Sequence, residues 1–281
     1  MERIWKVSVW GVRGAMPKAD RDYLNYGGNT SCISVDCGEE FVIFDAGSGL
    51  LPLSGFLQSK NIKKVHILLS HLHLDHIIGL PAFPLLYDSE AEIHLYGQKP
   101  EGTDLQTLLG RAVGPPYWPL GFGKYKAALF IHELCADESF LIGRRLCVGT
   151  LLGSHPDSCL YYRLEQDGRE VGGGGDKSIV YALDCELTEE IAEHLIKFSR
   201  NCRLLVWDSN FTPEDIGRHR GWGHSTWEDG VQIGDAARVK HLLATHYDLR
   251  YNDEFLKEQE SRAKRSCGFI KFAREGMEIT L

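Results

Sequence analysis

Residues 70–76 read Ser70-His71-Leu72-His73-Leu74-Asp75-His76, so four side chains that can bind metal fall within six positions. They follow residues 64–69, an apolar, β-branched run that is typical of a buried strand. A strand that enters a short loop can direct one pair of side chains to one point and the next pair to a neighbouring point. The stretch therefore predicts two adjacent metal ions, one bound by His71 and His73 and the other by Asp75 and His76. Imidazole and carboxylate donors suit zinc, and also manganese or iron.

The stretch resembles the signature of the metallo-β-lactamase-fold hydrolases, and the resemblance extends over nearly the whole chain. It implies three more ligands, each after a strand-like run, and the chain has His155, Asp184 and His246 in the expected order. Seven ligands for two ions leave positions open for water and substrate, which indicates a catalytic site rather than a closed structural one. The resemblance implies that the first metal is bound by His71, His73 and His155, the second by Asp75, His76 and His246, and that Asp184 bridges both.

The resemblance also implies a fold, an αββα four-layer sandwich of the α+β class. Strand-like runs alternate with fewer helical segments, which agrees with this layering. Because the predicted ligands extend from residue 71 to residue 246, we expect one hydrolase domain over residues 1–281. We predict one helix over 188–199 and another over 252–266. A third helix should begin at the capping box of Ser225–Glu228. The predicted strands are 4–10, 31–36, 40–45, 64–69, 92–96, 127–132, 139–142, 145–151, 159–164, 178–183, 203–207, 240–245, 269–273 and 277–281.

Two glycine-containing segments strengthen the resemblance to the phosphodiesterases of this fold. Residues 26–32, Tyr-Gly-Gly-Asn-Thr-Ser-Cys, are similar to their "GGNTS" segment, although a plain hairpin entry explains the glycines equally well. Residues 44–49, Phe-Asp-Ala-Gly-Ser-Gly, resemble the "DAGTG" that follows it. The resemblance implies that Asp45 orients metal ligands without binding metal itself.

A third pair of segments, residues 204–211 and 223–226, predicts a proton donor. It is similar to the "HEATF…GHST" pair of the tRNA 3′-processing endonucleases and their phosphodiesterase relatives, although Trp207 and Asp208 stand where those proteins have His and Glu. The resemblance implies that His224 protonates the leaving oxygen and that Asp208 orients it. A plain position before a helix N-terminus is the alternative for His224. The predicted catalytic residues are Asp75, His224 and Asp208.

Residues 110–123 combine proline, glycine and aromatic side chains, and we expect an irregular apolar loop there. Such a loop could form a wall of the substrate pocket, a contact between two copies in a homodimer, or a cover packed over the core.

Composition narrows the function classes. The formal net charge of −8 disfavours a large nucleic-acid surface, which needs a basic patch. No run approaches the roughly 20 apolar residues of a membrane span, and residues 1–6 have no secretory apolar region, so we expect a cytoplasmic protein without a membrane partner. The eight cysteines are dispersed and favour buried free thiols.

The segments together predict a dinuclear hydrolase, with zinc as the first choice of metal. The resemblance is to the phosphodiesterase branch, near the phosphoribosyl 1,2-cyclic phosphate phosphodiesterases. It implies attack on a small phosphodiester, cyclic ones included, by a hydroxide that bridges the metals. The alternatives are a tRNA 3′-processing endonuclease, a hydrolase of thioesters, lactams or lactones, an iron oxidoreductase, and a sensor that keeps the fold without turnover.

Overall fold

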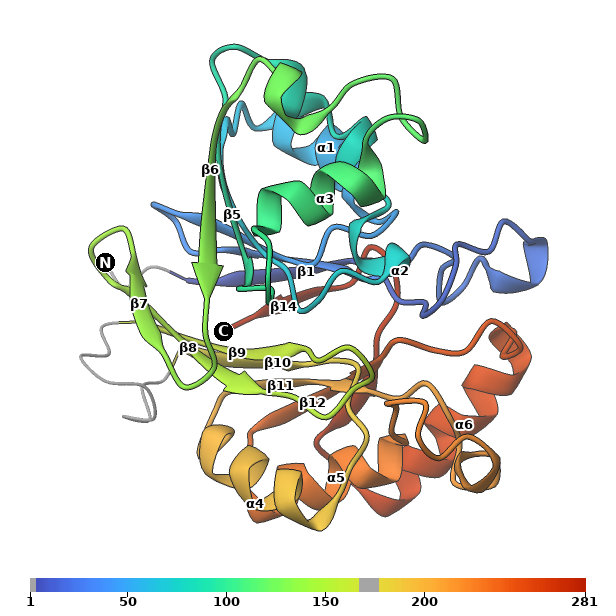
Figure 1. The fold of residues 1–281 in the computed structure, drawn as a ribbon. Helices are drawn as coiled ribbons and strands as arrows, with labels where there is room; N and C mark the ends of the chain where they lie inside the picture. Colours follow the sequence, from blue (N-terminus) through green and yellow to red (C-terminus); the bar gives the residue numbers. More distant parts are fainter. Residues whose placement is uncertain (1–3, 167–176) are drawn as a thin grey trace.

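The computed structural model describes residues 4–166 and 177–281, whose strands form two seven-stranded sheets stacked face to face (Figure 1). From edge to edge, the first sheet contains β14 (Glu278–Thr280), β1 (Lys6–Gly11), β2 (Cys32–Asp36), β3 (Phe41–Phe44), β4 (Lys64–Leu68), β5 (Glu92–Gln98) and β6 (Ala128–Leu134). The second contains β13 (Ile270–Phe272), β12 (His241–Thr245), β11 (Leu204–Asp208), β10 (Ser178–Ala182), β9 (Leu160–Gln166), β8 (Leu146–Leu152) and β7 (Ser139–Ile142).

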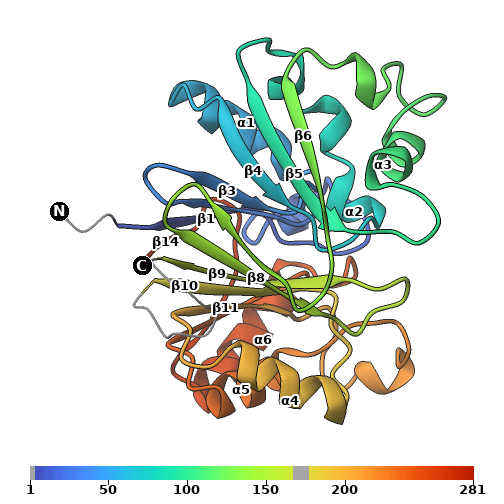
Figure 2. The ribbon, with the colours of Figure 1, turned by 60° about the vertical axis from the view of Figure 1, so that its left-hand side comes forward.

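Helices cover the outer face of each sheet. Figures 1 and 2 show α1 (Leu50–Ser59) and α3 (Leu105–Val113) outside the first sheet, and α4 (Glu189–Phe198), α5 (Trp227–Ala236) and α6 (Asp253–Ser266) outside the second. The short α2 (Leu74–Ile77) follows β4, and 3₁₀ turns lie at Arg21–Tyr23, Leu80–Ala82, Pro84–Tyr87, Phe122–Lys124 and Ile216–Arg218. The layers follow the order helix, sheet, sheet, helix, so the predicted αββα sandwich is confirmed.

Side-chain alternation explains why the sheets stack in this way. Along β3, Ile43 joins the apolar cluster under α1, whereas Phe44 joins the cluster between the sheets. Phe44 stacks there on Tyr181 of β10, with ring centroids 4.8 Å apart. Strands that are buried on both faces read as continuous apolar runs, which is how these strands were recognised in the sequence.

Strand direction brings distant segments of the chain to one edge of the sandwich. The strands β3 to β6 are parallel in the first sheet, and β10 to β13 are parallel in the second. Loops at the carboxyl ends of parallel strands commonly form ligand sites. Here the ends of β4, β10, β11 and β12 carry residues that the sequence analysis singled out.

Every predicted strand has its counterpart, but two helix-related predictions were wrong in detail. The capping box is formed by Thr226 and Asp229, not by Ser225 and Glu228, because the Ser225 hydroxyl donates instead to the carbonyl of Cys185. Residues 110–113 are the last turn of α3, so the irregular segment begins only at Gly114. Within it Phe122 is buried in the cluster that contains α1, which agrees with a cover packed over the core.

Candidate metal centre and active site

The seven predicted metal ligands meet at one edge of the sandwich, although they come from both sheets. The loop after β4 and the adjoining α2 supply four of them, and the loops after β8, β10 and β12 supply one each. They are His71, His73, Asp75, His76, His155, Asp184 and His246.

These side chains form two groups that could each hold a metal ion. Donor atoms of His71, His73 and His155 lie within 4.8 Å of one another, with Nδ1 of His73 3.1 Å from Nε2 of His155. Donor atoms of Asp75, His76 and His246 form the second group, in which Oδ2 of Asp75 lies 3.3 Å from Nε2 of both histidines. Donor atoms of three further sets also lie within 4.8 Å of one another, so which residues share an ion stays a prediction; the sets are His71, His76 and Asp184, His155, Asp184 and His224, and Asp208, His224 and His246.

Asp184 lies between the two groups. Its Oδ1 is 3.7 Å from Nε2 of His155 in the first group. Its Oδ2 is 3.0 Å from Nε2 of His76 and 3.5 Å from Nε2 of His246 in the second. A carboxylate that directs one oxygen to each group has the geometry that a bridging ligand requires.

Unsatisfied polar atoms test whether metal ions fit this site. Nε2 of His71, Nε2 of His76 and Oδ2 of Asp184 are buried and make no hydrogen bond within the part of the chain that the structure describes. A buried polar atom without a partner is costly, and such atoms commonly mark a missing ion. Because all three atoms converge on one point, the residues present fit bound cations.

Contacts outside the two groups select which nitrogen of each histidine faces the centre. Nδ1 of His76 donates to Oδ2 of Asp45 at 2.7 Å, which leaves Nε2 directed toward Asp75 and Asp184. Nδ1 of His155 donates to the carbonyl of Gly223 at 2.9 Å, which leaves Nε2 directed toward His73 and Asp184. Such contacts orient the ring of a metal-binding histidine and set its tautomer.

The buried carboxylates draw positive charge into the site. Burial lowers the pKa of His71 well below its usual value, so this imidazole is neutral and can donate a lone pair. Burial alone would also lower the pKa of His246, but the charge of Asp184 and the Asp208 carboxylate, whose Oδ1 lies 3.7 Å from Nδ1 of His246, raise it to about 10. The negative charge of Asp184 and its neighbouring carboxylates therefore favours positive charge at the site, either on protonated histidines or on bound metal ions.

Three residues of the site adopt a strained backbone conformation. The φ angles of Asp45, Asp184 and His246 are 57°, 56° and 65°, in the left-handed region that non-glycine residues rarely occupy. Asp45 and His246 directly follow β3 and β12, and Asp184 lies two residues after the end of β10, where a left-handed residue turns the chain abruptly. Such strain is concentrated at functional sites, where the surrounding structure compensates for its cost.

His224 stands beside both metal-ligand groups and contacts the residue predicted to orient it. Its ring centroid is 5.3 Å from that of His155 and 5.3 Å from that of His246. Its Nδ1 donates to Oδ2 of Asp208 at 2.9 Å, which leaves Nε2 without that contact. Burial opposes protonation, but the charge and hydrogen bond of Asp208 raise the pKa of His224 above its usual value.

The structure accommodates Trp207 at the position where the resemblance implies histidine. Trp207 is fully buried in the core, and its indole N–H donates to the carbonyl of Thr226 at 3.0 Å. Trp207 therefore contacts Thr226, the N-cap residue of α5, two positions after His224. The shorter Asp208 still reaches His224, so neither departure from the family sequence disrupts the contact.

Sequence reasoning missed two groups that touch the site. The backbone N–H of Ala15 donates to Oδ2 of Asp75 at 2.8 Å, and no side chain in the sequence marks such an amide. The Tyr181 hydroxyl donates to Oδ2 of Asp45 at 2.7 Å from a fully buried position. Tyr181 reads as an ordinary core residue in a strand, and only its place three residues before Asp184 could have drawn attention to it.

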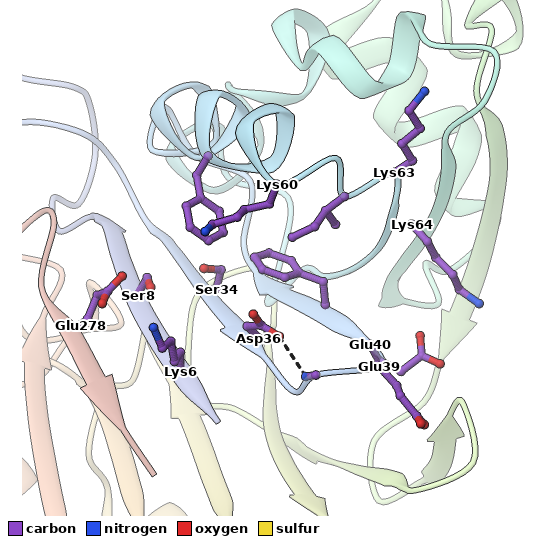
Figure 3. Close-up of a pocket in the computed structure, with 14 residues that line it drawn as sticks. Lys6, Ser8, Ser34, Asp36, Glu39, Glu40, Lys60, Lys63, Lys64 and Glu278 are labelled. Carbon is purple, nitrogen blue, oxygen red and sulfur yellow. Dashed lines mark hydrogen bonds between the residues drawn. The ribbon is translucent and has the colours of Figure 1, made fainter. Parts of the chain in front are cut away.

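A cleft of about 670 Å³ opens beside the first group. His71 and His73 line it, and Gln98, Lys99, Glu101, Asp157 and Ser158 add polar and charged groups among apolar side chains. A separate hollow of about 560 Å³ lies on the outer side of β1 and β2 and is lined by Lys6, Asp36 and Lys60 among others (Figure 3). None of the predicted site residues lines that hollow, whereas His71 and His73 line the cleft beside the first group.

The two-sheet fold and the paired donor groups define a metal-dependent hydrolase. The family model of the Beta-lactamase superfamily domain matches residues 33–247, more than half of the chain, and the chain belongs to this superfamily. The match extends from β2 to just beyond His246 and so includes all seven predicted ligands.

Individual relatives resemble the chain over nearly its full length. Ribonuclease Z of Pyrococcus horikoshii is 24% identical over an alignment that covers 93% of this chain and 91% of that protein. The crystal structure of YhfI, a metallo-β-lactamase-fold protein of Bacillus subtilis, superposes with a TM-score of 0.73 at 22% identity and covers 99% of this chain and 100% of that one. A structure described as a new diphosphatase from the PhnP family gives a TM-score of 0.67 at 18% identity, with coverage of 98% and 97%.

No helix among residues 4–166 and 177–281 combines the length and the apolar character that a membrane crossing requires.

Proposed function

We propose that this hydrolase is a two-metal phosphodiesterase that acts on a small phosphodiester. The observation that carries the proposal is the pair formed by His224 and Asp208, 2.9 Å apart, beside both metal-ligand groups. Hydrolysis of a phosphodiester expels an alkoxide, which needs a proton as it leaves. Thioesters expel a thiolate that needs a proton far less, so this pair favours the phosphodiesterase over the thioesterase alternative.

We assign the metal ligands as the sequence predicts. His71, His73 and His155 would hold the first ion, Asp75, His76 and His246 would hold the second, and Asp184 would be a ligand shared by both. Two divalent ions bound there would supply Lewis acidity and lower the pKa of a water molecule toward neutrality. The mixed imidazole and carboxylate donors make zinc our first choice, with manganese and iron as alternatives.

The residues of the chain have separate tasks in this mechanism. Nε2 of His224 donates its proton to the leaving oxygen, while Asp208 holds Nδ1 and stabilises the imidazolium before the transfer. Asp75, whose Oδ2 accepts the Ala15 N–H at 2.8 Å, would help to orient the attacking water. Buried Asp45 and Tyr181 keep His76 in one orientation throughout.

Cleft size, charge and chain organisation support a small substrate for a single domain. A cleft of about 670 Å³ is within the usual range for small-molecule sites. The net charge of −8 opposes extended contact with a nucleic-acid backbone. We treat residues 1–281 as one hydrolase domain, since each sheet supplies only part of the ligand set.

A ribonuclease that processes tRNA is the second candidate, because curated relatives of similar length are named ribonuclease Z. The two candidates differ in substrate size but not in the bond that is broken. Cleavage of a precursor tRNA in preference to small diesters would favour this second candidate.

The first experiment measures hydrolysis of bis(p-nitrophenyl) phosphate by protein reconstituted with zinc or manganese, alongside His224→Ala. We expect turnover that depends on metal and that decreases in the variant. Cleavage of thioesters or lactams in place of phosphodiesters would refute the phosphodiesterase proposal while leaving the metal centre intact. Elemental analysis of the purified protein identifies the metal independently.

A further inference from the structure

Glu186 connects the end of β10 to the glycine-containing segment that precedes α5. Both of its carboxylate oxygens accept the N–H of Gly221 at 2.8 Å, and Oε2 also accepts the N–H of Gly223 at 3.0 Å. Its own backbone N–H donates to the carbonyl of Ser154 at 2.8 Å. Three loops that are far apart in sequence are therefore joined at one residue.

The segment held by Glu186 carries two groups of the active site. Gly223 directs its carbonyl to Nδ1 of His155 at 2.9 Å, and the next residue in the chain is His224. Gly223 has a φ of 81°, and a Cβ atom there would lie 2.0 Å from Nδ1 of His155. Only glycine fits this position, and glycine leaves the segment flexible unless other contacts hold it.

We infer that Glu186 is a positioning residue that holds His224 in place through this segment. The inference rests on the proposed function, since it assigns to His224 the role of proton donor. Hydrogen bonds to a charged carboxylate are roughly twice as strong as those between neutral groups. Glu186 forms no ion pair with any residue that the structure describes, so its charge acts on the backbone amides of Gly221 and Gly223.

Position matters here because proton transfer depends steeply on geometry. A displacement of about 1 Å at a reacting group can reduce the rate about 100-fold. Without the Glu186 carboxylate, the N–H groups of Gly221 and Gly223 form hydrogen bonds with water and the segment becomes more mobile. His224 keeps its contact with Asp208, but the backbone that carries it is no longer fixed.

The test compares Glu186→Ala and Glu186→Gln with the wild type at saturating zinc. The substrates are bis(p-nitrophenyl) phosphate and diphenyl phosphate, whose phenolate leaving group has a conjugate acid with a pKa of about 10. We expect Glu186→Ala to lower kcat roughly 10- to 100-fold on diphenyl phosphate and less than about 3-fold on the nitrophenyl ester. Glu186→Gln keeps one acceptor oxygen and should restore part of the activity. Glu193→Ala, a change at an exposed acid of α4, is the matched control.

A double variant shows whether Glu186 acts through His224. Glu186→Ala combined with His224→Ala should be no slower on diphenyl phosphate than His224→Ala alone, because groups that act as one unit are not additive. Equal losses on both substrates, or a full additional loss in the double variant, would overturn the inference.

Amide hydrogen exchange tests the anchoring without any substrate. The amides of Gly221 and Gly223 should exchange faster in Glu186→Ala than in the wild type, and unchanged protection would overturn the inference. If the wild type cleaves no phosphodiester, the proposed function fails, while the exchange measurement still decides whether Glu186 holds the segment.

Discussion

Nδ1 of His224 lies 2.9 Å from Oδ2 of Asp208, and the same oxygen accepts the backbone N–H of Cys185 at 3.1 Å. Asp208 is fully buried, and its Oδ1 accepts the N–H of Asn210 at 2.9 Å. Burial opposes ionisation, yet the charge and hydrogen bond of His224 keep the pKa of Asp208 below its usual value. The carboxylate is therefore charged and held from three sides, so it can orient His224 without moving itself.

Replacing Asp208 should change how the rate depends on pH. His224 can donate a proton only in its protonated form. Because Asp208 raises the pKa of His224, the wild type should stay active to higher pH than a variant without that charge. Asp208→Asn removes the charge, and the alkaline limb of kcat/KM for diphenyl phosphate should move to lower pH. The maximal rate should fall roughly 100-fold or more. Asp235→Asn, at an exposed position of α5, is the control, and an alkaline limb at the wild-type pH in Asp208→Asn would contradict the assignment.

Tyr181→Phe should weaken both folding and zinc binding. It removes the hydroxyl that donates to Asp45 and leaves a buried carboxylate with one partner fewer. We expect the free energy of unfolding to fall by about 1–3 kcal/mol and zinc affinity to fall about 10- to 100-fold. Chemical denaturation and a competitive zinc titration measure the two effects.

Tyr26→Phe is the matched control for that variant. Tyr26 is also buried and donates to a carboxylate, Oε2 of Glu260 at 2.7 Å, but Glu260 contacts none of the predicted ligands. Tyr26→Phe should lower the free energy of unfolding without changing zinc affinity. Equal zinc affinity in Tyr181→Phe and the wild type would show that Tyr181 does not support the centre.

Removing the metals should destabilise the fold. Ions that bind only the folded chain, at a free concentration about 100 times their Kd, raise the free energy of unfolding by about 2.7 kcal/mol. A chelator should therefore lower Tm by roughly 5–10 °C. Adding zinc back should restore it. His155→Ala should retain about half of the bound zinc, because it removes a ligand of one group only. Equal Tm values with and without chelator would count against a metal centre.

Lys99→Ala should weaken substrate binding without affecting the chemical step. Lys99 is exposed and lines the cleft beside His71 and His73. A single exposed charge pair is worth up to about 1 kcal/mol, so KM should rise up to about 5-fold while kcat stays constant. Lys257→Ala, on the exposed side of α6, controls for the change in net charge. A large fall in kcat with constant KM would place Lys99 in the chemistry instead.

The predictable parts of the site are those encoded close together in the sequence. His71, His73, Asp75 and His76 fall within one short stretch after a strand, so their proximity follows from chain geometry. Asp184 and His246 were predicted because the family resemblance implies a ligand after an apolar run at each of these places. The Ala15 amide and the Glu186 anchor could not be found in this way, because their partners lie 60 and 35 residues away and are in part backbone groups.

The sequence by itself determined the strands and the clustered ligands His71 to His76, because apolar runs and close spacing are local properties of the chain. The layering and the remaining candidate ligands followed from the resemblance to a known family. Only the tertiary structure decided the distances between the two groups, the nitrogen of each histidine that faces the centre, and the contact between Asp208 and His224. The physical reason is that these features depend on how two sheets stack and how loops after β4, β8, β10, β11 and β12 meet. No local pattern encodes such long-range packing, whereas the folded chain sets the distances between these side chains.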